Sequence, residues 1–178
     1  VNNMKGNSLI IIPTYNESEN IERIINKILL LNDSNDILVV DDNSPDGTSK
    51  IVSDLKKENI DRVFLIVRDT KLGLGSAYKE GFNWALNKNY SYIFEMDADL
   101  SHDPNEIVKL KELLIKKESD VAIGSRYLEG VSVVNWPLSR IFLSYFANIY
   151  VRIITGMPVK DATSGFIGYT NESLSSLN

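Results

Sequence analysis

Cysteine is absent from the 178 residues of the chain, and histidine occurs only once. The lack of cysteine excludes disulfides and thiolate metal sites, and no secretory signal peptide is recognisable. These two observations together predict a protein of a reducing compartment. We interpret the single histidine, His102, as a loop residue and not as a catalyst.

Long apolar runs and clusters of basic residues are also missing. No apolar run approaches the roughly 20 residues that span a bilayer, which argues against a transmembrane helix. The net charge is −5 and the Lys and Arg residues are spread out, which argues against nucleic acid as a partner. The length predicts a single domain over residues 1–178, in which we expect residues 1–7 to be flexible.

Apolar runs of strand length alternate with segments of helical periodicity. The expected strands are residues 8–13, 37–40, 63–67, 92–94 and 120–124, and helical patterns fill the intervals between them. Uninterrupted apolar runs are typical of parallel strands that are buried on both faces. The pattern therefore predicts an α/β fold with a doubly wound, mostly parallel sheet and helices on both faces. After Arg126 the alternation stops, and we expect a helix over residues 136–155 and a late strand over residues 166–169.

Two of the helices carry sequence signals of their starts. Asn16 and Glu19 have the spacing of a capping box, which predicts the start of the first helix. Asp103, Pro104 and Glu106 suit the N-cap, first and third positions of a later helix.

Polar loops follow three of the expected strands, at residues 13–17, 41–47 and 97–101. In open parallel sheets, ligands bind in the crevice beyond the carboxyl ends of the strands. The third loop contains Asp97 and Asp99, which point the same way if the backbone is extended, so their carboxylates can converge. Hard oxygen ligands at this spacing suit Mg²⁺ or Mn²⁺. A polar turn before the next helix is the alternative interpretation.

The three loops together suit a nucleotide diphosphate compound. Tyr15 can flank a base, and Glu17 and Asp42 can accept hydrogen bonds from a base or a ribose. The carboxylate pair can hold a divalent ion against the diphosphate. Arg126 can offer a planar fork to phosphate oxygens, or it can form a surface salt bridge instead.

Two other classes of protein explain the pattern less well. A nicotinamide-dependent dehydrogenase carries Gly-x-Gly-x-x-Gly after its first strand. Here residues 13–17 contain no glycine, and Gly73 and Gly75 follow the third strand instead. A non-catalytic nucleotide-sugar-binding module is a remote alternative, since such a module does not require a metal-spaced carboxylate pair.

Six short motifs stand in a fixed order along the chain. They are residues 13–17 (PTYNE), 41–48 (DDNSPDGT), 72–77 (LGLGSA), 97–101 (DADLS), 124–127 (GSRY) and 161–166 (DATSGF). With these motifs the chain resembles the inverting glycosyltransferases of family 2, from about residue 8 to residue 169. Within that family it looks most like the subgroup that acts on dolichyl or polyprenyl phosphate.

The resemblance implies a GT-A fold and transfer of mannose from GDP-mannose to a polyprenyl phosphate, with Mg²⁺ or Mn²⁺ as cofactor. It implies donor contacts at Pro13, Tyr15, Glu17, Val40, Asp42, Asp97, Ala98, Asp99 and Arg126. It places the metal at Asp97 and Asp99, with Ser101 as a possible third group, and the catalytic group at Asp97, Asp99 and Arg126. We further expect the acceptor to lie near Arg140 and Ser144. The alternative is a related family 2 enzyme that uses a UDP-sugar with undecaprenyl phosphate or a glycan.

The implied acceptor accounts for the lack of an obvious general base. A phosphate monoester is already anionic at neutral pH and can attack without losing a proton to the protein. Members of the family continue beyond the point that matches Asn178, so we expect the chain to be a catalytic domain truncated at its carboxyl end.

The helix expected over residues 136–155 has apolar side chains around more of its circumference than a single core-facing stripe needs. We expect it to border the acceptor site, with Arg140 near the acceptor phosphate, and to lie peripherally on the cytoplasmic face of a membrane. An ordinary core helix is the alternative.

Overall fold

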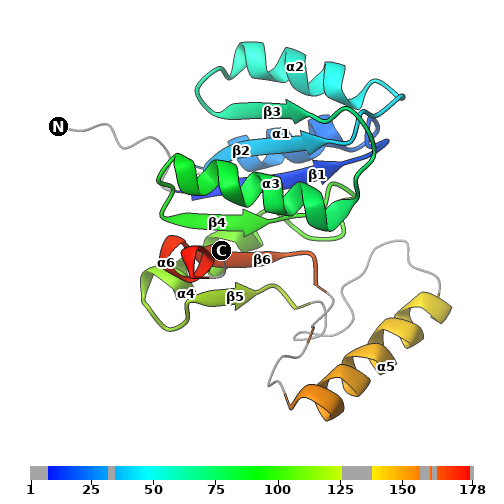
Figure 1. Ribbon diagram of the computed structural model, residues 1–178, viewed down its shortest axis with the longest axis vertical. Coiled ribbons are helices and arrows are strands. Elements are labelled where there is room, and N and C mark those ends of the chain that lie inside the picture. The colour runs from blue at the N-terminus through cyan, green and yellow to red at the C-terminus, as the bar shows by residue number, and fades with distance from the viewer. Residues whose placement is uncertain (1–7, 32–34, 126–137, 157–160, 162–163, 177–178) are drawn as a thin grey trace.

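The computed structural model describes residues 8–31, 35–125, 138–156, 161 and 164–176, with the backbone alone for residues 138–145. The strands are β1 (Ser8–Thr14), β2 (Asn35–Asp41), β3 (Val63–Val67), β4 (Tyr92–Glu95), β5 (Val121–Ile123) and β6 (Ile167–Thr170). The helices are α1 (Ile21–Leu29), α2 (Thr48–Glu58), α3 (Leu74–Asn87), α4 (Glu106–Ile115), α5 (Leu138–Thr155) and α6 (Asn171–Ser175) (Figure 1).

The strands form one sheet in the order β3-β2-β1-β4-β6-β5. β1 pairs in parallel with β2 and with β4, and β2 pairs in parallel with β3. β6 lies between β4 and β5 and is antiparallel to both. The predicted mostly parallel α/β sheet is therefore confirmed, and the late strand is the one that reverses direction.

Alternate residues of the buried strands belong to two apolar layers, one on each face of the sheet. On one face, Ile10 and Ile12 of β1 belong to a cluster with the apolar sides of α1, α2 and α4. On the other face, Leu9 and Ile11 belong to a cluster with α3 and α6, and Figure 1 shows α3 crossing this face. Each face of β1 is fully buried, which explains its uninterrupted apolar sequence.

The strand order reverses beside β1, because the chain adds β2 and β3 on one side of it and β4 on the other. The loops after β1 and β4 therefore diverge at this point, and the carboxyl ends of the two strands border an open crevice. This topological switch point is where ligands bind in doubly wound sheets.

The first predicted helix start is wrong. Asn16 has a positive φ of 62°, so it lies in a turn and cannot be an N-cap. Its main-chain amide donates to Ser44 Oγ at 3.0 Å, and α1 begins later, at Ile21, with Asn20 in the N-cap position.

The second predicted start is two residues early. The carboxylate of Asp103 does accept a hydrogen bond from the amide of Asn105 at 3.1 Å. However, Glu106 N donates to Asp103 O, which closes a tight turn that precedes the helix. The α-helix itself begins at Glu106 with Asn105 at its N-cap.

In Figure 1, α5 is set apart from the sheet, on the side of β5 and β6. Within the residues that the structure describes, no helix combines the length and the apolar character needed to cross a membrane.

Gly81 brings α3 into close contact with the sheet. A Cβ atom added at this buried glycine would lie 2.6 Å from Ile11 Cγ2, well inside normal contact distance. Gly75, near the start of the same helix, has no atom within 4 Å of such a Cβ. Comparing the same substitution at Gly81 and at Gly75 therefore separates the effect of close packing from the effect of helix propensity.

We expect Gly81→Ala to lower the free energy of unfolding by about 1–3 kcal/mol, because the added methyl overpacks the contact with β1. The gain of about 1 kcal/mol in helix propensity only partly offsets this loss. Urea denaturation measures the change, and Gly75→Ala is the control, with unchanged or higher stability expected. Equal stability of the two variants would show that α3 has room to shift.

Candidate functional site

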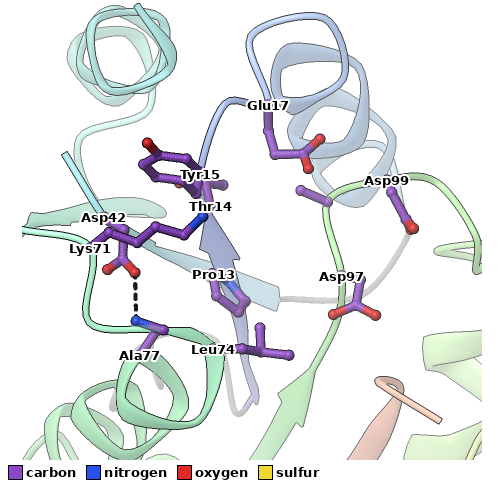
Figure 2. A pocket seen from close by; sticks show the side chains of 12 residues that line it. Pro13, Thr14, Tyr15, Glu17, Asp42, Lys71, Leu74, Ala77, Asp97 and Asp99 are labelled. Atoms are coloured by element: carbon purple, nitrogen blue, oxygen red, sulfur yellow. Dashed lines mark hydrogen bonds between the residues drawn. The ribbon is translucent and has the colours of Figure 1, made fainter. Parts of the chain in front are cut away.

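A cavity of about 260 Å³ lies at the carboxyl ends of the parallel strands, at the switch point beside β1. It is lined by Pro13, Thr14, Tyr15, Glu17, Asp42, Lys71, Gly73, Leu74, Ala77, Asp97, Ala98 and Asp99. These residues come from the end of β1, from the loops after β1, β2, β3 and β4, and from the first turn of α3. Figure 2 shows Asp42 and Lys71 on one side of the cavity and Asp97 and Asp99 on the other.

The loop after β1 is fastened to the loop after β2. Three consecutive main-chain amides of the first loop donate to three side chains of the second. The bonds are Asn16 N to Ser44 Oγ, Glu17 N to Thr48 Oγ1 and Ser18 N to Asp46 Oδ2, each 3.0 Å long. They hold the backbone directly after Tyr15 and around Glu17, and both of these residues line the cavity.

Asp41 links the loops after β1 and β2 through hydrogen bonds to its carboxylate. Its fully buried carboxylate accepts hydrogen bonds from Thr14 Oγ1 at 2.7 Å, Ser44 N at 2.9 Å and Ser44 Oγ at 2.6 Å. A buried carboxylate needs such donors, because leaving it unpaired costs several kcal/mol.

Asp42 lines the cavity but is held from within the protein. One of its oxygens pairs with the buried guanidinium of Arg68. The other accepts from the amides of Leu72 at 3.1 Å and Gly73 at 3.0 Å. Arg68 also donates to Gly73 O at 3.0 Å. The loop that leads into α3 is thus tied to the end of β2, and Asp42 is less free to meet a ligand than the sequence suggested.

Lys71 is the basic residue of this cavity that the sequence did not single out. Its ammonium group lies over the ring of Tyr15, 3.7 Å from the ring centroid, within the range of a cation–π contact. Both side chains are at the exposed rim of the cavity. The ammonium group of Lys71 therefore covers one face of the Tyr15 ring, and a flat ligand ring that stacks on that face would displace it.

Asp97 and Asp99 follow β4 directly, and their surroundings differ. Asp97 is half-buried, and its Oδ1 accepts a hydrogen bond from the Tyr78 hydroxyl at 3.3 Å. Asp99 is exposed, and its Oδ1 accepts from the amide of Ser101 at 2.9 Å. Leu100, the residue between Asp99 and Ser101, has a φ of 58°, so the chain turns sharply after Asp99.

The donor set in this loop suits a hard divalent ion that takes its remaining ligands from a substrate. Within the described residues, no group of three or more His, Cys, Asp or Glu side chains could hold a metal. Mg²⁺ is commonly bound by one or two carboxylates together with substrate phosphates and water. Asp97 and Asp99 fit that arrangement.

Most of the residues expected at the site do line the cavity: Pro13, Tyr15, Glu17, Asp42, Asp97, Ala98 and Asp99. Val40 is fully buried in the core, and Ser101 lies beside the cavity without lining it. Arg126 lies outside the described residues, and for Arg140 and Ser144 only the backbone of α5 is described.

The sequence did not indicate Thr14, Lys71, Gly73, Leu74 or Ala77 as cavity residues. Thr14 and Lys71 had one usable signal, because Thr14 is the last residue of β1 and Lys71 stands in the loop that follows β3. Gly73, Leu74 and Ala77 belong to the motif at residues 72–77, which carries the family resemblance but did not assign these residues a role.

The fold and the site define an α/β domain with a cavity and an acidic loop at the switch point of its sheet. The family model described as Glycosyl transferase family 2 matches residues 9–177. The chain therefore belongs to glycosyltransferase family 2.

Three curated relatives are similar over most of the chain. Polyprenol monophosphomannose synthase of Mycolicibacterium smegmatis is 44% identical over 96% of the chain and 64% of the relative. Undecaprenyl-phosphate mannosyltransferase of Micrococcus luteus is 39% identical over 96% and 69%. Dolichol-phosphate mannosyltransferase of Pyrococcus furiosus is 41% identical over 92% and 46%. The chain thus spans less than two thirds of the first relative and under half of the third.

Solved structures share the fold at low sequence identity. A mannosyltransferase from Pyrobaculum calidifontis, in complex with GDP-Man and Mn²⁺, superposes with a TM-score of 0.65 at 19% identity, over 99% of this chain and 48% of that one. A glucosyl-3-phosphoglycerate synthase from Mycobacterium tuberculosis, in complex with UDP, gives 0.66 at 18% identity, over 94% and 57%. The fold is that of the GT-A glycosyltransferases.

Glu95 is the last residue of β4 and lies two positions before Asp97, the first carboxylate of the acidic loop at residues 97–101. Its Oε1 accepts a hydrogen bond from the Tyr169 hydroxyl at 3.1 Å. Burial raises the pKa of Glu95 from 4.5 to about 7; the bond from Tyr169 opposes this rise, and the charge of Asp97 adds to it. The folded protein therefore holds the proton of Glu95 more tightly than the unfolded chain does.

Glu95 should make stability fall as the pH rises. Its contribution is fully present below the unfolded pKa of 4.5, is lost between pH 4.5 and about 7, and is constant above that. Glu95→Gln keeps an acceptor for Tyr169 and cannot ionise. The thermal unfolding temperature of the variant, relative to that of the parent, should increase as the pH rises from about 5 to 8.

The control for this measurement is Glu106→Gln, which neutralises an exposed acid paired with Lys109 on α4. The pH profile of the control should run parallel to that of the parent. A parallel profile for Glu95→Gln as well would contradict the assignment.

Proposed function

We propose that the protein is an inverting glycosyltransferase that moves mannose from GDP-mannose to a polyprenyl phosphate. The observation that carries the proposal is the cavity at the switch point, with an aromatic ring and acceptors at one side and two carboxylates at the other. The names of the three curated relatives support the choice of mannose and of a lipid phosphate.

In this proposal the nucleoside lies along the loops after β1 and β2. Tyr15 flanks the base with Lys71 at its edge, and Glu17 accepts hydrogen bonds from the base or the ribose. Asp42 remains a proposed donor contact, although its carboxylate already accepts from Arg68 and from the amides of Leu72 and Gly73. Arg126 remains a proposed donor contact.

Asp97 and Asp99 would hold Mg²⁺ or Mn²⁺ beside the diphosphate. When bound, such an ion supplies positive charge that stabilises the departing diphosphate. The protein's own part is to orient the two carboxylates and to place the sugar within reach of the acceptor. Ser101, whose amide holds Asp99, is proposed to assist from the same turn.

The acceptor needs little help from the protein as a base. A phosphate monoester is anionic at neutral pH, so no side chain has to remove a proton before attack. Arg140 and Ser144 of α5 are the proposed contacts of this phosphate.

The function is tested by following labelled mannose from GDP-mannose in the full-length protein with Mn²⁺. We expect a polyprenyl phosphate to accept mannose. Transfer to the matching polyprenol should reach at most a tenth of that rate. Transfer from UDP-glucose or UDP-GlcNAc in place of GDP-mannose should also reach at most a tenth of it. Asp99→Asn should fold normally and lose the metal-dependent part of GDP-mannose binding, because an amide is a weaker ligand. Equal transfer to the free alcohol, or a preferred UDP-sugar, would contradict the proposal.

We further propose that α5 rests on the cytoplasmic face of a membrane, where the lipid acceptor is found. One stripe of this helix exposes large apolar side chains: Phe146, Tyr150, Ile153 and Ile154 are each at least 62% exposed. On the side of the helix away from this stripe, Asn148 is buried and reaches Asp161. An exposed apolar stripe with Tyr and Arg152 beside it is typical of a helix that lies in the membrane interface.

Liposome flotation of the full-length protein checks this contact. Phe146→Ser with Ile153→Ser should reduce the vesicle-bound fraction severalfold, because two large apolar groups no longer enter the interface. GDP-mannose affinity should stay unchanged. Ile60→Ser, at an exposed site after α2, is the matched control and should float like the parent. Unchanged flotation of the double variant would contradict the proposal.

A further inference from the structure

The carboxylate of Asp97 is enclosed by two segments that lie far apart in the sequence. From α3, the Tyr78 hydroxyl donates to Oδ1 at 3.3 Å. From the segment before β6, the main chain of Gly165 lies against the same group. A Cβ atom added at Gly165 would be 2.3 Å from Oδ2 and 2.8 Å from Cγ. The space beside the carboxylate is therefore available only because residue 165 has no side chain.

Tyr78 is itself held firmly. Its side chain is 7% exposed and belongs to the apolar cluster between α3 and the sheet. Its ring stacks on Phe82, with 6.2 Å between centroids and 20° between planes. The hydrogen bond to Asp97 thus comes from a rigid part of the molecule.

Among the residues that the structure describes, Asp99 has no comparable enclosure. It is exposed, and it accepts a hydrogen bond from the amide of Ser101 within its own turn. The two carboxylates of the acidic loop therefore differ in freedom, although they are separated by a single residue.

We propose that Tyr78 and Gly165 are positioning residues that preset the carboxylate of Asp97 for the metal–diphosphate group, while Asp99 moves to meet the ion. This inference rests on the proposed function. It gives a role to the tyrosine that follows the LGLGSA motif and to the glycine of the DATSGF motif. A carboxylate that is already ordered loses less side-chain entropy when it binds, which raises affinity without a new contact.

The test is GDP binding by the full-length protein with and without Mn²⁺, followed by calorimetry and by the electron paramagnetic resonance signal of free Mn²⁺. Tyr78→Phe keeps the ring stack and removes the hydroxyl. We expect its metal-free GDP affinity to stay within about twofold of the parent and the gain caused by Mn²⁺ to fall about fivefold, the range expected for one freed side chain. Gly165→Ala should lower that gain at least as much, because the added methyl displaces the carboxylate.

Tyr90→Phe is the matched control. It removes another tyrosine hydroxyl that donates to a carboxylate, that of Asp36 at 2.8 Å, at the opposite edge of the sheet. It should leave the Mn²⁺ response unchanged even if it lowers thermal stability. If Tyr78→Phe responds to Mn²⁺ as the parent does, the inference is overturned and the proposed function stands. If the parent itself shows no Mn²⁺-dependent nucleotide binding, both are overturned.

Discussion

The buried carboxylates of Asp41 and Asp42, side by side at the end of β2, are the constraint on which the rest of the site depends. Charges in the core are tolerated only when enough donors surround them. Asp41 takes its donors from the loops after β1 and β2, and Asp42 takes its own from Arg68 and the loop before α3. Satisfying these two groups therefore ties three loops to one strand end.

This arrangement produces a site whose two sides differ in rigidity. On the β2 side, the loops are held by main-chain amides and by a buried ion pair, so Tyr15 and Glu17 lie on a fixed backbone. On the β4 side, Asp97 is enclosed while Asp99 stands in an exposed turn. In the proposed function, this arrangement offers a preformed surface for the rigid part of a nucleotide beside a group that can adjust to an ion.

The strands and the order of the helices could be predicted because their signals are local. Buried strands need continuous apolar runs, and the helices need a repeating apolar face. The signal for each element therefore lies within the residues of that element. The helix starts were predicted less well. Asn16 has the right spacing from Glu19, but its amide binds Ser44, 28 positions away, and its φ is positive. At Asp103 the capping bond forms, but it closes a turn ahead of the helix.

The sequence by itself determined the class of fold, the edge of the sheet at which the cavity lies, and the pair of acidic residues that stands there. These follow from residue type and from short, fixed spacings. Only the tertiary structure decided that β6 inserts between β4 and β5, that Arg68 neutralises Asp42, and that Gly165 lies against Asp97. Each of these pairs residues that are distant in the chain, and the geometry that joins them exists only once the two apolar layers have closed around the sheet.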